Sequence, residues 1–231
     1  MDHFLKNSLM SIKFGSLAIT VILLFALLPS LAFGWQKVRE KDGIQVFQKP
    51  IAGTTLVAFK GEGIIEESLL RVASVLFDVA RSPEWSKSIG ESRILKWLDP
   101  RTYIEYDHVK TPIIIKDRDF VTRVRLDYNK DEAKMIFEYQ SVEDESAPKT
   151  RYVRGHVISA SYVLRAIDAT RTYLVGELSG DPKGSLPSWI VNYYQRDWPI
   201  ETIQNLRAQV KKSDIQDSPV IKAVLEGTLQ P

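Results

Sequence analysis

The sequence contains no cysteine in its 231 residues. Without cysteine the chain can form no disulfide, hold no thiolate-ligated metal and carry no thiol nucleophile. A lipoprotein-type anchor is excluded as well, because that lipid is attached to a cysteine. Histidine is also scarce, with three residues in all. Of two side chains that often act in catalysis and metal binding, the sequence therefore lacks one and contains few copies of the other.

The sequence has no long run of charges of one sign, and its net charge is only +2. Nucleic acids and anionic membrane surfaces are bound through clusters of lysine and arginine. We therefore expect no nucleic-acid partner and no polybasic membrane patch. The hydrophobic share of 44% and the charged share of 26% are typical of a globular domain with a substantial core.

Catalytic motifs are absent too. There is no Gly-x-Ser-x-Gly elbow, no phosphate-binding glycine loop and no cluster of metal ligands. Glu105 and His108 have a Glu-x-x-His spacing, but that spacing serves a metal only on a helix, where both side chains share a face. On the strand predicted here they point to opposite sides. We expect a protein that is not an enzyme, with no cofactor and no metal.

The first 34 residues differ from the rest of the chain. Lys6 and Lys13 precede the almost uninterrupted apolar run 14–33, and the small residues Ala32 and Gly34 lie at its end. This pattern is typical of a secretory signal peptide and predicts a periplasmic or secreted protein. The alternative is a retained membrane anchor formed by residues 14–33, because about 20 apolar residues can span a bilayer.

The beginning of the mature chain predicts two strands and a helix. Residues 43–48 and 56–65 look like strands, with a turn at Asp42-Gly43. Residues 66–80 have apolar side chains every three or four positions, which predicts an amphipathic helix that ends at Ser82-Pro83.

The region from 92 to 179 is rich in strands. Residues 120–128 and 135–139 alternate apolar and polar side chains, and the turn between them predicts a hairpin. Such alternation indicates a sheet that is covered on one face and wet on the other, as in antiparallel sheets.

The C-terminal part is predicted to be helical. Ser188 can cap a helix that reaches about Lys212, and Pro199 must kink or interrupt it. A helix laid across a curved antiparallel sheet gives an α+β fold with space between its layers. Residues 213–231 form either a tail or a short capping helix.

Six segments of residues 35–212 resemble, in order, the START (steroidogenic acute regulatory-related lipid transfer) family in its bacterial form. They are WQKVREKDGIQVFQKP, LVAFKGEG, VLFDVARSPEWSKSI, KDRDFVTRVR, APKTRYVRGHVISASYVL and DPKGSLPSWIVNYY. The residues that match the motifs, for which we expect structural roles, are Trp85, Arg118, Asp119, Arg154, Gly184 and Pro187.

The resemblance implies a helix-grip fold, in which a curved antiparallel sheet wraps around a long C-terminal helix and encloses a cavity. It further implies a monomeric lipid-binding or lipid-transfer protein that encloses one phospholipid, sterol or other apolar molecule and touches membranes transiently. Two alternatives stay open. One is an enzyme on the same fold that resembles polyketide cyclases and aromatases, and the other is a ligand sensor whose main partner is another protein.

On this fold the predicted ligand-binding residues lie on the inner face of the sheet and on the C-terminal helix. They are Glu105, Phe120, Val124, Met135, Phe137, Tyr139, Trp189, Ile190 and Tyr193. Sterol-binding relatives carry an acid and an arginine at the positions of Glu105 and Val124. The alternation of Ile104 and Tyr106, by contrast, turns Glu105 outward unless a bulge intervenes, so its orientation stays open.

Overall fold

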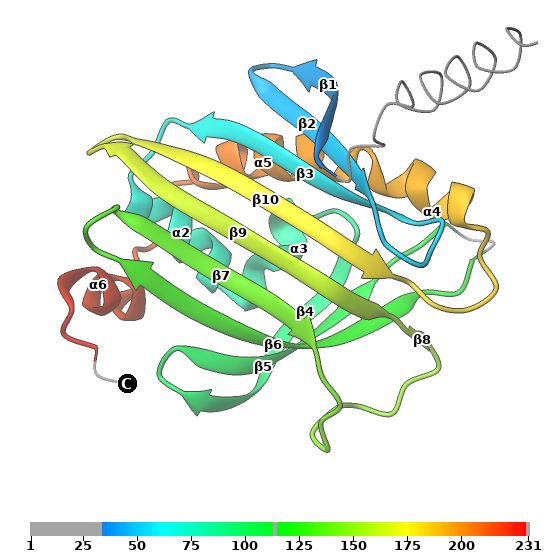
Figure 1. The fold of residues 1–231 in the computed structure, drawn as a ribbon. Coiled ribbons are helices and arrows are strands. Elements are labelled where there is room, and N and C mark those ends of the chain that lie inside the picture. The colour runs from blue at the N-terminus through cyan, green and yellow to red at the C-terminus, as the bar shows by residue number, and fades with distance from the viewer. Residues whose placement is uncertain (1–33, 113–114, 230–231) are drawn as a thin grey trace, which may run out of the picture. The chain divides into compact units, whose positions relative to one another are not determined.

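The computed structural model describes residues 34–112 and 115–229 (Figure 1). The predicted signal peptide or anchor within residues 1–33 lies outside the described residues. Within the described ranges, the structure contains no helix with the length and apolar character needed to cross a bilayer.

One curved sheet forms the body of the domain, and its strands run antiparallel apart from one short parallel pair (Figure 1). The strands are β1 (Gln36–Lys41), β2 (Ile44–Pro50), β3 (Val57–Ile65), β4 (Ile89–Asp99), β5 (Thr102–Val109), β6 (Arg118–Asn129), β7 (Lys134–Ser141), β8 (Val153–Arg154), β9 (His156–Asp168) and β10 (Arg171–Asp181). Their order is β1-β2-β3-β10-β9-β7-β6-β5-β4, and β8 pairs in parallel with β6. Helices cover the concave face, so the predicted helix-grip fold is confirmed.

Two predicted turns close hairpins of this sheet. Asp42 and Gly43 both have positive φ angles, 53° and 70°, as a two-residue turn between right-twisted strands requires. The turn after Asn129 joins β6 to β7, and the register places Leu126 opposite Phe137. The apolar side chains of both strands consequently share the concave face.

The first predicted helix is shorter than its periodicity suggests. Helix α2 (Leu69–Phe77) begins after Ser68, whose hydroxyl accepts a hydrogen bond from the backbone N–H of Arg71 at 3.2 Å. A 3-10 turn (Val79–Arg81) and the short helix α3 (Ser82–Trp85) follow it. Ser82-Pro83 therefore starts a helix instead of ending one, because proline is well suited to a first helical turn.

The C-terminal helix is divided in two. Helix α4 (Ser188–Gln195) ends before Asp197, and α5 (Trp198–Gln209) begins with Pro199 in its first turn. There the missing N–H of proline has no helical partner to lose. The predicted interruption at Pro199 is thus found, as a break between two helices and not as a kink in one.

A last helix, α6 (Pro219–Glu226), packs against α2 with Ile221 and Val224 buried in the core. The core lies at this end of the concave face, between the sheet and α2, α5 and α6. Along β6, Leu126 belongs to this core, while Phe120 lines a cavity at the other end of the same strand.

Candidate ligand-binding cavity

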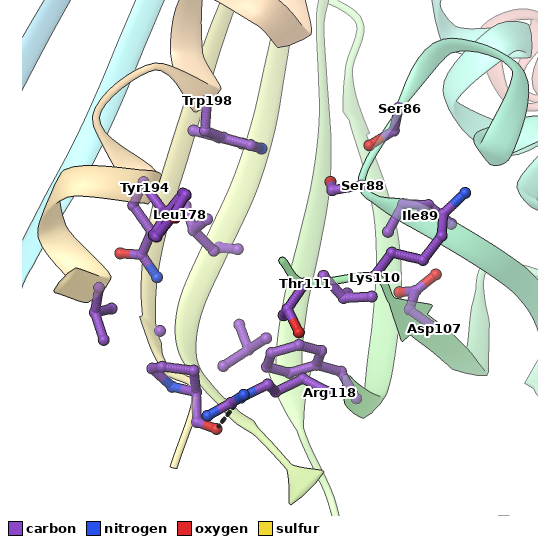
Figure 2. A pocket seen from close by; sticks show the side chains of 18 of the residues that line it. Ser86, Ser88, Ile89, Asp107, Lys110, Thr111, Arg118, Leu178, Tyr194 and Trp198 are labelled. Atoms are coloured by element: carbon purple, nitrogen blue, oxygen red, sulfur yellow. Dashed lines mark hydrogen bonds between the residues drawn. The ribbon is translucent and has the colours of Figure 1, made fainter. Parts of the chain in front are cut away.

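A cavity of about 620 Å³ lies between the concave face and α3, α4 and the start of α5. Figure 2 shows two of its walls: Ile89, Asp107 and Lys110 lie on one side, and Leu178, Tyr194 and Trp198 on the other. Thr111, Ile115 and Leu186, the last in the loop before α4, also line the cavity. The lining of the cavity as a whole is mainly apolar.

Five of the predicted ligand-binding residues line this cavity: Glu105, Phe120, Tyr139, Ile190 and Tyr193. Trp189 does not, since its side chain is 71% exposed on the far side of α4. Successive residues of a helix point in different directions, so Ile190 reaches the cavity and Trp189 faces solvent.

Val124, Met135 and Phe137 lie in the packed core, away from the cavity. Val124 packs with Tyr103 and Val79, and the other two pack in the main core. The reason is the position of the helices along the sheet. They fill the space above the second half of β6 and the first half of β7, so only the opposite end of these strands borders the cavity.

The structure settles the orientation of Glu105, which points into the cavity. Glu105 lies opposite Thr122 in a regular β5–β6 ladder, so no bulge in this ladder is needed to turn it inward. Ile104 and Tyr106 do face the other side, where they are buried by Val121 and part of the segment that follows β7. Both faces of β5 are covered here, which is why the alternation along this strand could not decide the orientation of Glu105.

Four side chains on the cavity wall have a buried polar atom without a hydrogen-bond partner. They are Trp85 (Nε1), Glu105 (Oε2), Thr122 (Oγ1) and Gln195 (Oε1). The other oxygen of Glu105 accepts a hydrogen bond from Ser92 at 3.1 Å. Buried polar atoms without partners are costly in a folded protein. A ligand that offers matching groups would remove that cost.

Burial also shifts the acidity of the cavity carboxyls. It raises the pKa of Glu105 well above the ordinary value, and the nearby charge of Asp107 adds to the effect. Burial raises the pKa of Asp107 to about 6. Asp107 was not predicted as a site residue, although its position two residues from Glu105 on the same strand places both on one face.

The motif residue Arg118 ties the cavity wall to the loop before α4. Its guanidinium donates to the carbonyl oxygens of Pro182 at 3.3 Å and Lys183 at 3.2 Å, and also to that of Lys116. Gly184 in the same loop has a φ of 77°, a conformation that favours glycine. Pro187 directly precedes α4. The structural roles expected from the motif fit these contacts.

Asp119 and Arg154 form a second structural pair on the other face of β6. Asp119 is 1% exposed and accepts hydrogen bonds from Arg154 Nε at 2.8 Å and Thr150 Oγ1 at 2.7 Å. A Cβ atom on Gly155 would lie 2.3 Å from the ring of Phe120. Gly155 of the Val-Arg-Gly segment therefore helps to position Phe120, which lines the cavity, because only glycine leaves room for its ring.

Two side chains of helix α4 fasten it to residues 55–57. The hydroxyl of Ser188 accepts a hydrogen bond from Thr55 Oγ1 at 2.6 Å. Asn192 donates to the carbonyl oxygen of Thr55 at 3.1 Å and accepts from the backbone N–H of Val57 at 3.1 Å. Of its residues only Val191 is fully buried. Helix α4 thus borders the cavity with few anchoring contacts.

The comparisons with known proteins agree with this fold. Residues 24–214 match the family model described as START domain. An uncharacterised protein of Pseudomonas aeruginosa is 24% identical over 186 residues, which cover 79% of this chain and 90% of that protein. The phosphatidylcholine transfer protein of Bos taurus is 24% identical over 163 residues, 69% of this chain and 76% of that protein. The crystal structure of human STARD10 superposes with a TM-score of 0.74 at 21% identity and covers 86% of this chain and 82% of that one.

Proposed function

The chain belongs to the START domain family, and on that premise we propose that it encloses one lipid-sized apolar ligand in its cavity and carries it between membranes without changing it chemically. The observation that carries this proposal is the largely apolar cavity between sheet and helices. Small-molecule sites typically have volumes of roughly 300–1,000 Å³, and this cavity lies within that range.

Burial of a hydrocarbon chain provides enough free energy for such a role. Each buried CH₂ group contributes roughly 0.8 kcal/mol, so about ten of them contribute about 8 kcal/mol, which corresponds to micromolar affinity before the cost of ordering the ligand. The relative named phosphatidylcholine transfer protein supports a lipid as the ligand.

We propose α4 as the moving part of the gate. Packing disfavours an opening at Pro199 itself, because Pro199 lies directly against Gly61 of β3. Helix α4 has far fewer anchoring contacts and carries the exposed aromatic residues Trp189, Tyr193 and Tyr194. Aromatic side chains of this kind favour the interface between a membrane and water. The proposed membrane contact is therefore through α4.

Export stays part of the proposal, with residues 1–34 as a cleaved leader or, alternatively, residues 14–33 as an anchor. The N-terminal sequence of the protein isolated from the producing cells distinguishes the two. A start at or near Trp35 supports cleavage, and an intact Met1 or a start upstream of residue 14 supports the anchor.

The proposal is tested by native mass spectrometry of the protein as the producing cell processes it, followed by extraction of the bound molecule. We expect one lipid per chain. Leu178→Trp should fill the cavity and abolish retention without loss of folding, whereas Ile167→Trp, at a 44% exposed position, should retain the lipid. A protein that is isolated empty and takes up no lipid from vesicles would overturn the proposal.

A further inference from the structure

The inner part of the cavity wall is rich in hydrogen-bond acceptors that lack partners. Glu105 and Thr122 are 5% and 2% exposed, and each has a side-chain oxygen without a partner. Gln195 adds a carbonyl oxygen from α4. Trp85 adds an unpaired donor, and the hydroxyl of Thr122 can donate as well as accept. A ligand that satisfies this set must bring mainly donors.

Two carboxyl groups dominate the charge at this place. Glu105 and Asp107 lie on the same face of β5 and both line the cavity. Burial disfavours ionisation of both groups in the empty protein, and the charge of Asp107 further disfavours ionisation of Glu105. A positive charge between them would reverse that preference, because an opposite charge within about 4–6 Å favours the ionised form.

The described part of the chain supplies no such cation. Arg118 directs its guanidinium to backbone carbonyl oxygens. Lys110 is exposed, and no ion pair joins it to either carboxyl group. Arg123 and Arg125 alternate to the exposed face of β6.

The remaining titratable groups of the wall do not change this balance. They are Glu177, Asp197, Glu201, the half-buried Tyr139 and Tyr162, and the exposed Tyr193 and Tyr194. Asp197 is paired with Arg39, Glu201 is exposed on α5, and Glu177 adds only more negative charge. Burial raises the pKa values of Tyr139 and Tyr162, which keeps these two side chains neutral.

We infer that the inner end of the cavity receives a protonated amine, held between Glu105 and Asp107, and that the ligand is an amphiphile with an N–H cation at one end and an apolar body. This inference rests on the proposed function, since it names the ligand class of the same cavity. An ammonium group provides three donors and one positive charge. A ligand carboxylate or phosphate at this place would be disfavoured, because it would face two acidic side chains and further hydrogen-bond acceptors.

The test compares four probes with the same twelve-carbon chain: dodecylamine, dodecyltrimethylammonium, dodecanol and dodecanoate. Binding is measured at pH 7.5 by displacement of Nile red from the lipid-free protein. We expect dodecylamine to bind at least tenfold more tightly than dodecanol and dodecanoate to bind most weakly. Dodecyltrimethylammonium, which has the charge without N–H donors, should bind more weakly than the amine.

Variants assign the preference to the two carboxyl groups. Glu105→Gln and Asp107→Asn should each reduce the affinity for dodecylamine about tenfold and leave the affinity for dodecanol within twofold. The matched control is Glu138→Gln, which removes one negative charge from an exposed position on β7. It should leave all four affinities unchanged.

The outcomes separate this inference from the proposed function. If all four probes bind equally, or if dodecanol or dodecanoate equals the amine, the cavity holds apolar chains but the inference is overturned. If no probe displaces Nile red and no lipid co-purifies, the proposed function itself fails. An amine preference that persists in both variants would also overturn the assignment to Glu105 and Asp107.

Discussion

Gly61 and Pro199 are in direct contact: a Cβ atom added to Gly61 would lie 2.6 Å from the Cβ atom of Pro199. This contact brings the start of α5 against β3. The side chain of Pro199 is a rigid ring at the start of a helix, so it cannot rotate away from Gly61 as a flexible side chain could. The position of α5, and with it one wall of the cavity, depends on the absence of a side chain at residue 61.

Gly61→Ala should therefore destabilise the fold by about 1–3 kcal/mol, the usual cost of overpacking. Urea unfolding measures the change. Gly180→Ala is the control, because the nearest atom to its added Cβ is 3.7 Å away, an ordinary contact distance. Equal stabilities for the two variants would contradict the role given to the Gly61–Pro199 contact.

Arg154→Met should destabilise the protein by about 2–3 kcal/mol at pH 7, because it leaves the buried carboxylate of Asp119 short of donors. Burial by itself raises the pKa of Asp119, but the hydrogen bonds from Arg154 and Thr150 hold it below its ordinary value. Its contribution to stability is thus present above about pH 4 and is lost as the pH falls through the lower folded pKa. The difference between wild type and variant should shrink in acid, as chemical denaturation at pH 7 and pH 3 measures. A difference that is constant with pH would contradict this account.

The ligand-free protein should become less stable as the pH rises from about 4 to 7. The folded state raises the pKa of Asp107 to about 6, above the unfolded value near 3.9, so the folded state binds the proton more tightly in this window. Asp107 should account for about 2–3 kcal/mol of this loss, and the loss should be smaller by that amount in Asp107→Asn. Thermal unfolding across this pH range provides the measurement, with Glu138→Gln as the control. A pH profile that is the same in Asp107→Asn and wild type would contradict the burial of this carboxyl group.

Asn192→Ala should speed the release of a bound lipid about tenfold, because it removes two of the three hydrogen bonds that fasten α4 to Thr55 and Val57 and leaves only the one between Ser188 and Thr55. The rate is measured by transfer of a fluorescent lipid to acceptor vesicles. Asn129→Ala also removes two side-chain hydrogen bonds, but in the β6–β7 turn far along the strand from the cavity, so it should leave the rate unchanged. Equal rates in the two variants would speak against α4 as the gate.

Trp189→Ser should weaken binding to phospholipid vesicles several-fold and change the free energy of unfolding by less than about 0.5 kcal/mol, because the indole is 71% exposed. Vesicle co-sedimentation measures the effect. Ile167→Ser, also exposed but located near the end of β9, should bind vesicles like the wild type. Loss of binding in both variants, or in neither, would remove α4 from the proposed membrane contact.

Much of the fold is visible in local sequence. The Asp42-Gly43 turn, the alternation along β6 and β7 and the break at Pro199 each follow from the conformational limits of a few neighbouring residues. The sequence also predicts the helix that precedes Asp78. It does not predict where this helix ends, because the apolar periodicity continues through the 3-10 turn and α3.

The site was only partly predictable. Phe120 and Phe137 have the same pattern in sequence, yet the first lines the cavity and the second lies in the core. Alternation shows that one face of a strand is shielded from water, but it does not show whether a helix or a cavity lies over that face. Asp107 was missed for a related reason: a carboxyl group on a strand is usually solvated, and only the surrounding walls make this one part of a cavity.

The sequence by itself determined the α+β class, the antiparallel sheet and the family resemblance, because these depend on periodicity and short motifs. Only the tertiary structure decided where along the sheet the core ends and the cavity begins, and that Glu105 faces inward beside Asp107. Those features depend on where α2, α4 and α5 lie over the strands, through contacts such as Gly61 with Pro199 between residues far apart in the chain.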